Sequence, residues 1–398
     1  MLAQPFLTRD ALARVLRSLL EAEWRMLRGK AAAAKVQTAA VNDMLLSSPE
    51  AWGCDSLDLL RLCAAANEMF HLHKAGVEQD LLSAPTFGAW LDVIQRSWGS
   101  GDAEVTFSTS GSTGPAKRCT HMQAFLAVEV EALANRFRDR RRIVALAPAH
   151  HIYGFLFTAL MPDALDVPCI EAERFNIAAL RATLQPGDLL VSFPERWAYL
   201  ACSLPDWPEQ VEGVVSTAPC PAETLDRLAE RGLARMTEVY GSSETAGIAW
   251  RAAPGASYDL MPHWQFLEPQ DAEAACLVHR DGSHHKLMDR VTRIGDRGFS
   301  LGGRRDGMVQ VGGINVSPSA VAGRLCERPG VRWAVVRLMR PAEGDRLKAL
   351  IGIGPDCDAS ATLTKLEAWA ALHLATAERP TVFTLSALEA QPAKTFDW

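Results

Sequence analysis

The chain has 398 residues, of which 48% are apolar and 22% charged, a composition typical of a globular protein large enough for two or three domains. A formal net charge of −6 excludes a general basic field for nucleic acid or anionic lipid, and no run approaches the ~18 apolar residues of a membrane span. Nine cysteines without a C-x-x-C pair fit reduced thiols, so we expect a cytoplasmic protein without nucleic-acid or membrane partners.

The first hundred residues read as helices. Thr8 can cap a helix over residues 8–29, and further helices are expected at 55–73 and 87–98. After a break at WGSGDAEV (98–105), short apolar runs alternate with helical patterns. The runs at 142–148, 188–194 and 211–217 are expected strands, and 222–232 is an expected helix.

This alternation predicts an α/β fold, with parallel-rich sheets flanked by helices. From about residue 294 the chain is rich in strands and glycine, and it ends in an α+β segment. We therefore expect a helical N-terminal region (1–98), a large core domain (99–305) and a small C-terminal lid domain (306–398).

The segment FSTSGSTGPAKR (107–118) is a glycine-rich loop that ends in a lysine. The backbone N–H groups of such a loop can converge on an anion, which predicts a phosphate cradle; a polar surface loop is the alternative. A Walker A loop is excluded, because Gly111 and Gly114 are only three residues apart and Arg118 follows Lys117. A G-x-S-x-G nucleophile elbow also fails, because 241–245 lacks the closing glycine.

TSGSTGPAK (109–117) closely resembles the phosphate-binding signature of the acyl-adenylate-forming (AMP-binding) superfamily. Six further segments resemble the signatures of that superfamily and follow in its order. They are PAHHIYG (148–154), STAPCP (216–221), YGSSET (240–245), IGDRG (294–298), GRRDGMVQVGGINVSP (303–318) and PAKTFDW (392–398).

The resemblance implies ATP and Mg²⁺ as cofactors, and it implies roles by position. Residues implied for the β- and γ-phosphates are Thr109, Ser110, Gly111, Ser112, Thr113, Gly114 and Lys117; those for the adenosine are Ser216, Ala218, Pro219, Tyr240, Gly241, Asp296 and Arg304. Glu244 would hold Mg²⁺, which prefers carboxylate and phosphate oxygens, and Thr245 would contact the α-phosphate. Lys394 would bridge the attacking carboxylate and the α-phosphate, and Asp306 would be the hinge of the lid.

The acid pocket is expected to draw on His151, Tyr153, Phe193 and Gly247, with Trp197, Ala246 and residues 216–219 as further candidates. Several of these residues have a structural alternative. Asp296 would then be a turn residue, Glu244 the start of a helix, and His151 and Tyr153 core side chains.

The chain also departs from the superfamily pattern. Gln310 stands where a lysine is common, Ala116 replaces the usual proline before Lys117, and Ala393 replaces the glycine before Lys394. The printed sequence continues for only four residues after Lys394, which bears on its assignment as the catalytic lysine.

The N-terminal region resembles an acyl carrier protein. GCDSLDLLRLCAAANEMFHLH (53–73) resembles the segment whose serine, here Ser56, receives phosphopantetheine, and 81–94 resembles a carrier's last helix. Two alternatives stay open: Asp55 and Ser56 simply cap a helix, or a degenerate carrier-like fold replaces a missing subdomain.

The function expected from this resemblance is ATP-dependent activation of a small acid, followed by transfer to the thiol of an acyl carrier protein or of CoA. A hydroxybenzoate-like aromatic acid is the first choice, as in short ligases of aryl-polyene and xanthomonadin-type pathways. The alternatives are a nonenzymatic or adenylate-only nucleotide-binding relative, and a CoA ligase for a short or medium fatty acid.

Overall fold

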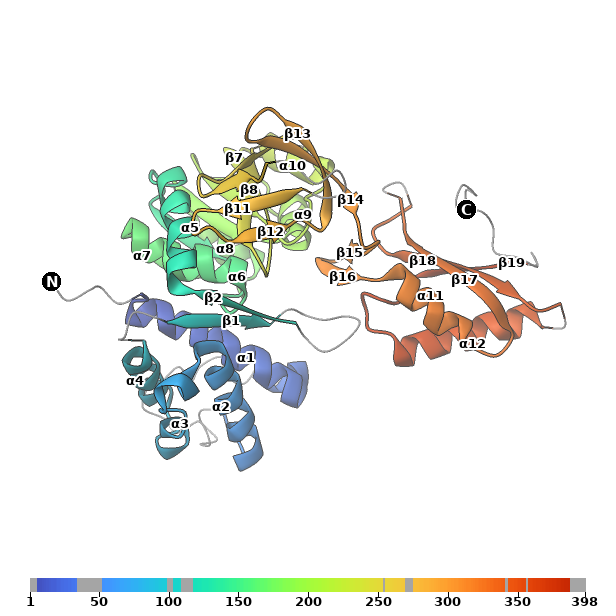
Figure 1. Cartoon of the computed structure of the whole chain (residues 1–398), viewed down its shortest axis with the longest axis horizontal. Coiled ribbons are helices and arrows are strands. Elements are labelled where there is room, and N and C mark those ends of the chain that lie inside the picture. The colour runs from blue at the N-terminus through green and yellow to red at the C-terminus, as the bar shows by residue number, and fades with distance from the viewer. Residues whose placement is uncertain are drawn as a thin grey trace. The chain divides into compact units, whose positions relative to one another are not determined.

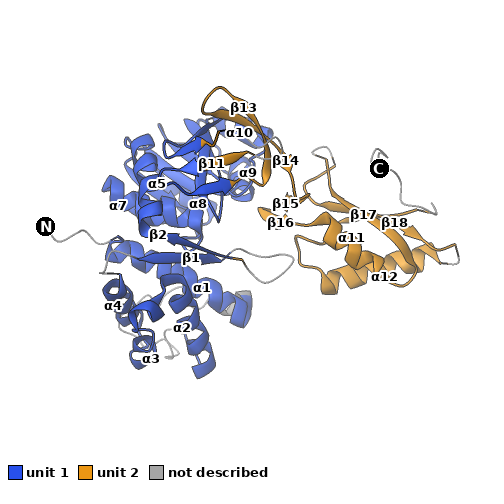
Figure 2. Ribbon diagram, in the orientation of Figure 1, with its two compact units in different colours: residues 1–109, 118–265, 278–285 blue, residues 110–117, 266–277, 286–398 orange. Residues whose placement is uncertain are grey.

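A computed structural model describes residues 6–33, 52–98, 103–108, 117–252, 255–268, 275–340, 343–355 and 357–386. The chain divides into two compact units, of which the first comprises residues 1–109, 118–265 and 278–285 (Figure 2). The second comprises residues 110–117, 266–277 and 286–398. The N-terminal helices therefore share a unit with the central sheet. The finer boundaries expected at 98 and 305 remain predictions.

The N-terminal helices gather beside a two-stranded sheet in the first unit (Figure 1). They are α1 (Arg9–Ala33), α2 (Ser56–Phe70), the 3-10 helix η2 (Leu72–Ala75), α3 (Asp80–Ser83) and α4 (Phe87–Ser97). Thr8 caps α1 as expected, since its Oγ1 accepts a hydrogen bond of 3.2 Å from the Ala11 N–H. Leu12 and Leu16 of α1 are completely buried, so the apolar face read from the sequence is the packed one.

The two-stranded sheet consists of β1 (Glu104–Ser108) and β2 (Arg118–Met122). The strands are antiparallel, and Ser108 lies opposite Arg118. The glycine loop connects these two strands, so the pairing holds both ends of the loop close together.

The main sheet of the first unit is mixed. Its strands in chain order are β3 (Arg142–Ala145), β4 (Cys169–Glu171), β5 (Asp188–Ser192), β6 (Glu212–Val215), β7 (Arg235–Ser242), β8 (Ala246–Arg251) and β9 (Tyr258–Leu260). They lie in the order β9-β8-β7-β6-β5-β3-β4. Strands β4, β3, β5, β6 and β7 run parallel to one another, whereas β8 is antiparallel to both β7 and β9.

Helices precede and connect these strands. They are α5 (Gln123–Arg136), α6 (Ile152–Gly154), the π-helix η3 (Phe155–Leu160), α7 (Met161–Leu165), α8 (Ile177–Thr183), α9 (Pro194–Ser203) and α10 (Ala222–Glu230). A core around Trp197, Leu190 and Leu228 joins the sheet to the helices that follow β4, β5 and β6. A small sheet of β10 (Trp264–Phe266), β11 (Cys276–His279) and β12 (His284–Lys286) comes next in the chain.

The second unit has its own core. Its elements are β13 (Asp289–Ile294), β14 (Gly298–Arg304), β15 (Val309–Val311), β16 (Ile314–Val316), α11 (Pro318–Cys326), β17 (Val331–Leu338), β18 (Leu347–Ile353), α12 (Ala359–His373) and β19 (Val382–Ser386). Strand β18 pairs antiparallel with β17 and parallel with β19. Leu347, Ile351 and Leu366 lie in the apolar cluster that joins this sheet to its helices.

The expected α/β class is confirmed by this architecture. Across the part of the chain that the structure describes, none of the helices combines the length and the apolar character needed to cross a bilayer.

Candidate active site

The predicted ligand residues of the first unit follow the carboxyl ends of adjacent parallel strands. His151 follows β3, Phe193 follows β5, Ser216 follows β6, and Tyr240 lies near the end of β7. In an open α/β sheet these ends share one edge, where ligands bind. The topology therefore brings His151 and Tyr240, which are 89 residues apart in the sequence, to the same edge of the sheet.

The Tyr-Gly-x-x-Glu-Thr block comprises the end of β7 and the turn at 243–245 that leads to β8. Glu244 is therefore not the start of a helix, which corrects that alternative. Thr245 is buried; its Oγ1 accepts from the Ser242 N–H at 3.2 Å and lies 3.1 Å from the Ala246 carbonyl oxygen. Gly241 is required, because a Cβ there would lie 2.0 Å from the same carbonyl oxygen. The exposed Glu244 is thus presented on a turn that its neighbours fix.

His121, which the sequence motifs did not indicate, supports this turn. Its Nε2 lies 2.7 Å from the carbonyl oxygen of Ser243, to which a protonated Nε2 donates. Burial lowers the pKa of His121, and the hydrogen bond to Ser243 opposes that shift only in part. A neutral ring beside the turn is therefore expected at physiological pH.

The expected adenine segment contains strained backbone. The Ser216 hydroxyl donates to the Val239 carbonyl at 2.9 Å and so ties the end of β6 to β7. The next residue, Thr217, has a φ of 81°, an unusual value for a β-branched residue. Tyr240 lies with its ring centroid 5.7 Å from that of Tyr258. Strain of this kind often marks a ligand-binding loop.

Two expected acid-pocket residues serve the core. The Tyr153 hydroxyl lies 3.0 Å from the Ser192 carbonyl oxygen and 2.9 Å from that of Val214, and burial raises the pKa of this phenol. Trp197 is completely buried and donates to the same Val214 oxygen at 3.0 Å, so its expected place in the pocket is corrected to the core. Phe193 is only half-buried.

His151 and Gly247, also expected in the acid pocket, lie on different elements, before α6 and in β8. Part of the His151 side chain is exposed, yet surrounding atoms desolvate its ring and lower the pKa of the imidazole. Gly247 is buried at the start of β8. Its N–H donates to Glu129 Oε2 at 2.9 Å, and its carbonyl accepts from Trp264 Nε1 at 2.8 Å. Glu129 is a second residue that the motifs did not indicate.

In the second unit, Asp296 is exposed on the turn between β13 and β14, as the turn alternative expected. Arg304 lies at the end of β14 and pairs with Asp306 at 3.0 and 2.7 Å. The hydrogen bonds from Arg304 hold the pKa of Asp306 below its usual range. Lys117 is exposed, and Gln310 pairs with Asn315 in the β15–β16 hairpin.

Other predicted residues lie outside the described ranges. They are Thr109, Ser110, Gly111, Ser112, Thr113, Gly114 and Lys394. Their roles stay predictions.

Ser56 is exposed at the first position of α2. Asp55 caps this helix in a capping box with Asp58, as the structural alternative expected. The predicted helix at 55–73 thus ends earlier, at Phe70, and 81–94 is divided between α3 and α4.

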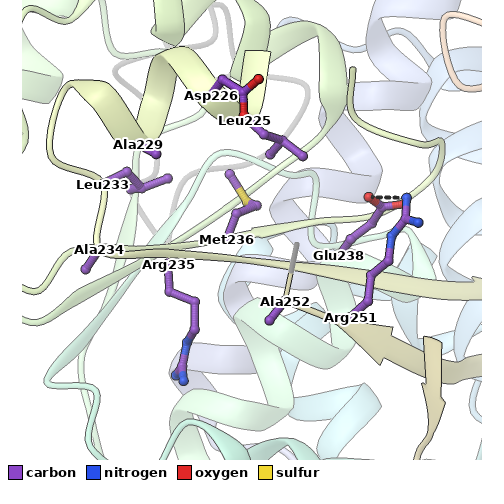
Figure 3. A pocket seen from close by; sticks show the side chains of 10 residues that line it. All are labelled: Leu225, Asp226, Ala229, Leu233, Ala234, Arg235, Met236, Glu238, Arg251 and Ala252. Carbon is purple, nitrogen blue, oxygen red and sulfur yellow. Dashed lines mark hydrogen bonds and ion pairs between the residues drawn. The ribbon is translucent and has the colours of Figure 1, made fainter. Parts of the chain in front are cut away.

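A cavity of about 250 Å³ lies beside the first half of β7 (Figure 3). Its charged lining residues are Asp226, Arg235, Glu238 and Arg251, and the Nη2 of Arg251 lies 3.0 Å from both carboxylate oxygens of Glu238. Because the predicted ligand residues are not among those lining the cavity, we assign it no part in the reaction.

The described residues contain no cluster of three or more His, Cys, Asp or Glu side chains suited to a metal ion. A single carboxylate such as Glu244 nevertheless fits Mg²⁺, because this ion usually keeps several waters and binds substrate phosphates.

The model of the AMP-binding enzyme family matches residues 74–266. The 4-coumarate–CoA ligase of Halorhodospira halophila is 36% identical over 380 residues, which are 94% of this chain and 95% of that protein. The 4-coumarate–CoA ligase of Cereibacter sphaeroides is 35% identical over 95% of this chain and 93% of its own length.

Two solved structures share the fold. An o-succinylbenzoate CoA synthetase from Bacillus subtilis, bound to a product analogue, superposes with a TM-score of 0.57 at 17% identity, over 74% of this chain and 68% of the other. A malonyl-CoA ligase with methylmalonyl-CoA and AMP bound gives 0.52 at 22% identity, over 72% and 71%.

The chain belongs to the AMP-binding enzyme family. The expected enzyme class, an acid–thiol ligase that uses ATP, is confirmed at this level.

Proposed function

We propose that the chain activates a small aromatic acid with ATP and transfers the acyl group to the thiol of CoA. The observation that carries this proposal is that two 4-coumarate–CoA ligases match it over 94% and 95% of its length, including the unusual N-terminal region. The turn that presents Glu244 and Thr245 at the carboxyl edge of the sheet supports the nucleotide-binding part.

In the first step an oxygen of the acid's carboxylate attacks the α-phosphorus of ATP, and the bond from that phosphorus to the diphosphate oxygen breaks. Diphosphate leaves, and an acyl-adenylate remains. Glu244 would hold Mg²⁺, which when bound neutralises charge on the phosphates. The chain contributes mainly by positioning the reactants and by placing cations around the triphosphate.

Thr245 would contact the α-phosphate. In the structure its hydroxyl group lies 3.1 Å from the Ala246 carbonyl oxygen. A phosphate oxygen would therefore compete with this carbonyl for the hydroxyl proton of Thr245. His151, kept mostly neutral by desolvation, would border the acid without adding a positive charge. In the second step the thiol sulfur attacks the acyl carbon, its proton is lost to solvent, and AMP leaves.

The first test is exchange of labelled diphosphate into ATP with a panel of aromatic and aliphatic acids. We expect hydroxylated benzoates or cinnamates to support exchange, and Lys394→Ala to reduce it at least a hundredfold. Lys365→Ala, an exposed lysine on α12, is the matched control. Exchange with short or medium fatty acids alone would favour the aliphatic alternative, and no exchange with any acid would favour a nonenzymatic relative.

The second test separates the acceptors. Thioester formation should occur with CoA; formation only with a holo-carrier protein would replace CoA in the proposal, as the aryl-polyene type implies. An adenylate that accumulates with neither acceptor would indicate an adenylate-only enzyme.

For the N-terminal region we propose a structural role rather than that of a carrier. Asp55 and Asp58 are engaged by Arg28 and by the helix cap. Arg14 donates to the Thr158 carbonyl at 2.7 Å, and the Thr8 hydroxyl lies 3.0 Å from Asp163, so α1 is tied to the rest of its unit. A carrier must travel to deliver its acyl group, which such contacts oppose. The intact mass should stay unchanged after incubation with CoA and a phosphopantetheinyl transferase; a mass gain lost in Ser56→Ala would restore the carrier hypothesis.

A further inference from the structure

Glu129 is a buried carboxyl group whose hydrogen bonds are only half satisfied. It lies on α5, and 1% of its surface is exposed. Its Oε2 accepts from the Gly247 N–H at 2.9 Å. Within the described residues, its Oε1 is buried and has no hydrogen-bond partner. A buried polar atom in this condition costs about 1–3 kcal/mol, so its retention calls for an explanation.

The chemistry of this group is that of a neutral acid. Burial raises the pKa of Glu129 to about 8, and the hydrogen bond from Gly247 offsets the effect only partly. A protonated carboxyl carries one donor. Because Oε2 already accepts from Gly247, Oε1 is the oxygen available to donate.

Gly247 makes room for this oxygen. A Cβ at position 247 would lie 2.3 Å from Oε1 of Glu129 and 2.9 Å from the Met261 methyl group. Gly247 is also held from its other side by the Trp264 indole, which donates to its carbonyl at 2.8 Å. Glu129 therefore meets the backbone at a residue that we assign to the wall of the acid pocket.

We propose that Glu129 selects the acid: Oε2 fixes Gly247, and Oε1 forms a hydrogen bond with a hydroxyl group at the end of the acid remote from its carboxylate. The inference rests on the proposed function, which puts an aromatic acid beside Gly247. It names the substrate class as hydroxylated aromatic acids. A site built to hydrogen-bond a hydroxyl group discriminates strongly against an analogue that lacks it, because the buried protein group is then left unpaired.

The test compares matched acids, 4-hydroxycinnamate against cinnamate and 4-hydroxybenzoate against benzoate, by kcat/KM for thioester formation. We expect the wild-type protein to favour the hydroxylated acid of the better pair at least a hundredfold. Glu129→Met should reduce this ratio at least tenfold, chiefly by lowering kcat/KM for the hydroxylated acid. Glu129→Gln keeps a donor and an acceptor and should retain the ratio within about threefold.

Two further variants test whether the change in the ratio is specific to Glu129 and to its contact with Gly247. Glu131→Gln changes a carboxylate with a 68% exposed side chain on the same helix and should leave the ratio unchanged. Gly247→Ala leaves the carboxyl group in the sequence but displaces it, and should also lower the ratio. Circular dichroism and the melting temperature identify any variant that has failed to fold.

An unchanged ratio in folded Glu129→Met and Gly247→Ala proteins would overturn the inference and leave Glu129 as a support for β8. Failure of the proposed function gives a different result, because the wild-type protein would then show no acid-dependent diphosphate exchange. If Glu129→Met does not fold, the ratio in Gly247→Ala decides.

Discussion

The ring of His150 lies with its centroid 4.2 Å from that of His151, at an interplanar angle of 41°. The hydroxyl of Ser18, on the first helix, shares a hydrogen bond of 2.8 Å with Nδ1 of His150. The N-terminal region thus reaches, through one histidine, the residue expected to border the acid. The first helix is therefore linked to His151 by one hydrogen bond and one ring contact.

The burial of His150 predicts that the free energy of unfolding falls as the pH is lowered. Burial, with smaller effects of His151 and Arg25, lowers the pKa of His150 to about 3. Between its ordinary pKa of 6.5 and that value, the unfolded chain binds a proton that the folded protein does not, so the free energy of unfolding falls as the pH is lowered. His150→Asn should remove roughly 1–2 kcal/mol of the loss between pH 6.5 and 5.

Urea unfolding at several pH values measures this loss. The exposed His284 provides the control His284→Asn, which should follow the wild-type curve. A His150→Asn protein with the wild-type pH dependence would mean that His150 is not held neutral in the folded state.

The contacts of the Tyr153 hydroxyl group predict that its removal lowers the free energy of unfolding. Its hydroxyl contacts the carbonyl oxygens at the ends of β5 and β6, so Tyr153→Phe leaves these buried oxygens with fewer partners. We expect a loss of about 1–3 kcal/mol in the free energy of unfolding. Tyr199→Phe removes a hydroxyl from a residue that is 51% exposed and should change little. Equal unfolding midpoints for the two variants would contradict the structural role of Tyr153.

The same residues show how far the sequence could lead. Periodicity identified α1 and the strands around 142, 188 and 212, because each pattern is local. Motif resemblance assigned Glu244 and Thr245. His121 and Glu129 were missed because their partners, Ser243 and Gly247, are 122 and 118 residues away, and only tertiary packing brings them together.

Trp197 shows the opposite error. It was expected among the residues of the acid pocket. In a helix, however, a shift of a few residues turns a side chain to another face. Here the indole donates to the Val214 carbonyl, and its ring packs in the apolar core.

The strained backbone at Thr217 predicts that glycine at this position would raise the free energy of unfolding. A φ of 81° in a β-branched residue costs on the order of 1–3 kcal/mol. Glycine tolerates this conformation but loses more entropy on folding, so Thr217→Gly should gain about 1 kcal/mol in stability. Thr217→Val keeps the branched side chain and should not gain. Should both variants be equally destabilised, the hydroxyl contacts of Thr217 would outweigh the strain.

The Arg304–Asp306 pair lies in the proposed hinge, so we predict that a change at Asp306 affects thioester formation more than adenylate formation. Asp306 accepts from Arg304 and, at 3.0 Å, from the Met308 N–H, while Gly307 has a φ of 68°. Asp306→Ala removes these bonds from the proposed hinge. We expect diphosphate exchange to stay within about threefold of wild type, while thioester formation falls about tenfold. Parallel losses in both assays would argue against a hinge and for a ribose-binding role of this turn.

The buried carboxyl group of Glu129 predicts that the free energy of unfolding falls as the pH rises. This dependence is opposite in sign to that expected from His150. Its pKa of about 8 in the folded protein lies above the ordinary value of 4.5, so between these values the folded state holds a proton that the unfolded chain releases. The free energy of unfolding must then fall as the pH rises from 4.5 to 8, at up to about 1.4 kcal/mol per pH unit. The side chain of Glu129→Gln cannot ionise, so the free energy of unfolding of this variant should fall less between pH 4.5 and 8.

Urea unfolding from pH 5 to 9 checks this expectation. The variant should gain on the order of a few kcal/mol over wild type near pH 8 and little near pH 5, because the unfolded wild-type chain ionises at this position as the pH rises above 4.5, whereas the unfolded variant cannot. Glu131→Gln, a change at an exposed site, should leave the slope intact. A Glu129→Gln protein that is destabilised equally at every pH would show that the carboxyl group is ionised and paired, and that Oε1 has no proton to donate.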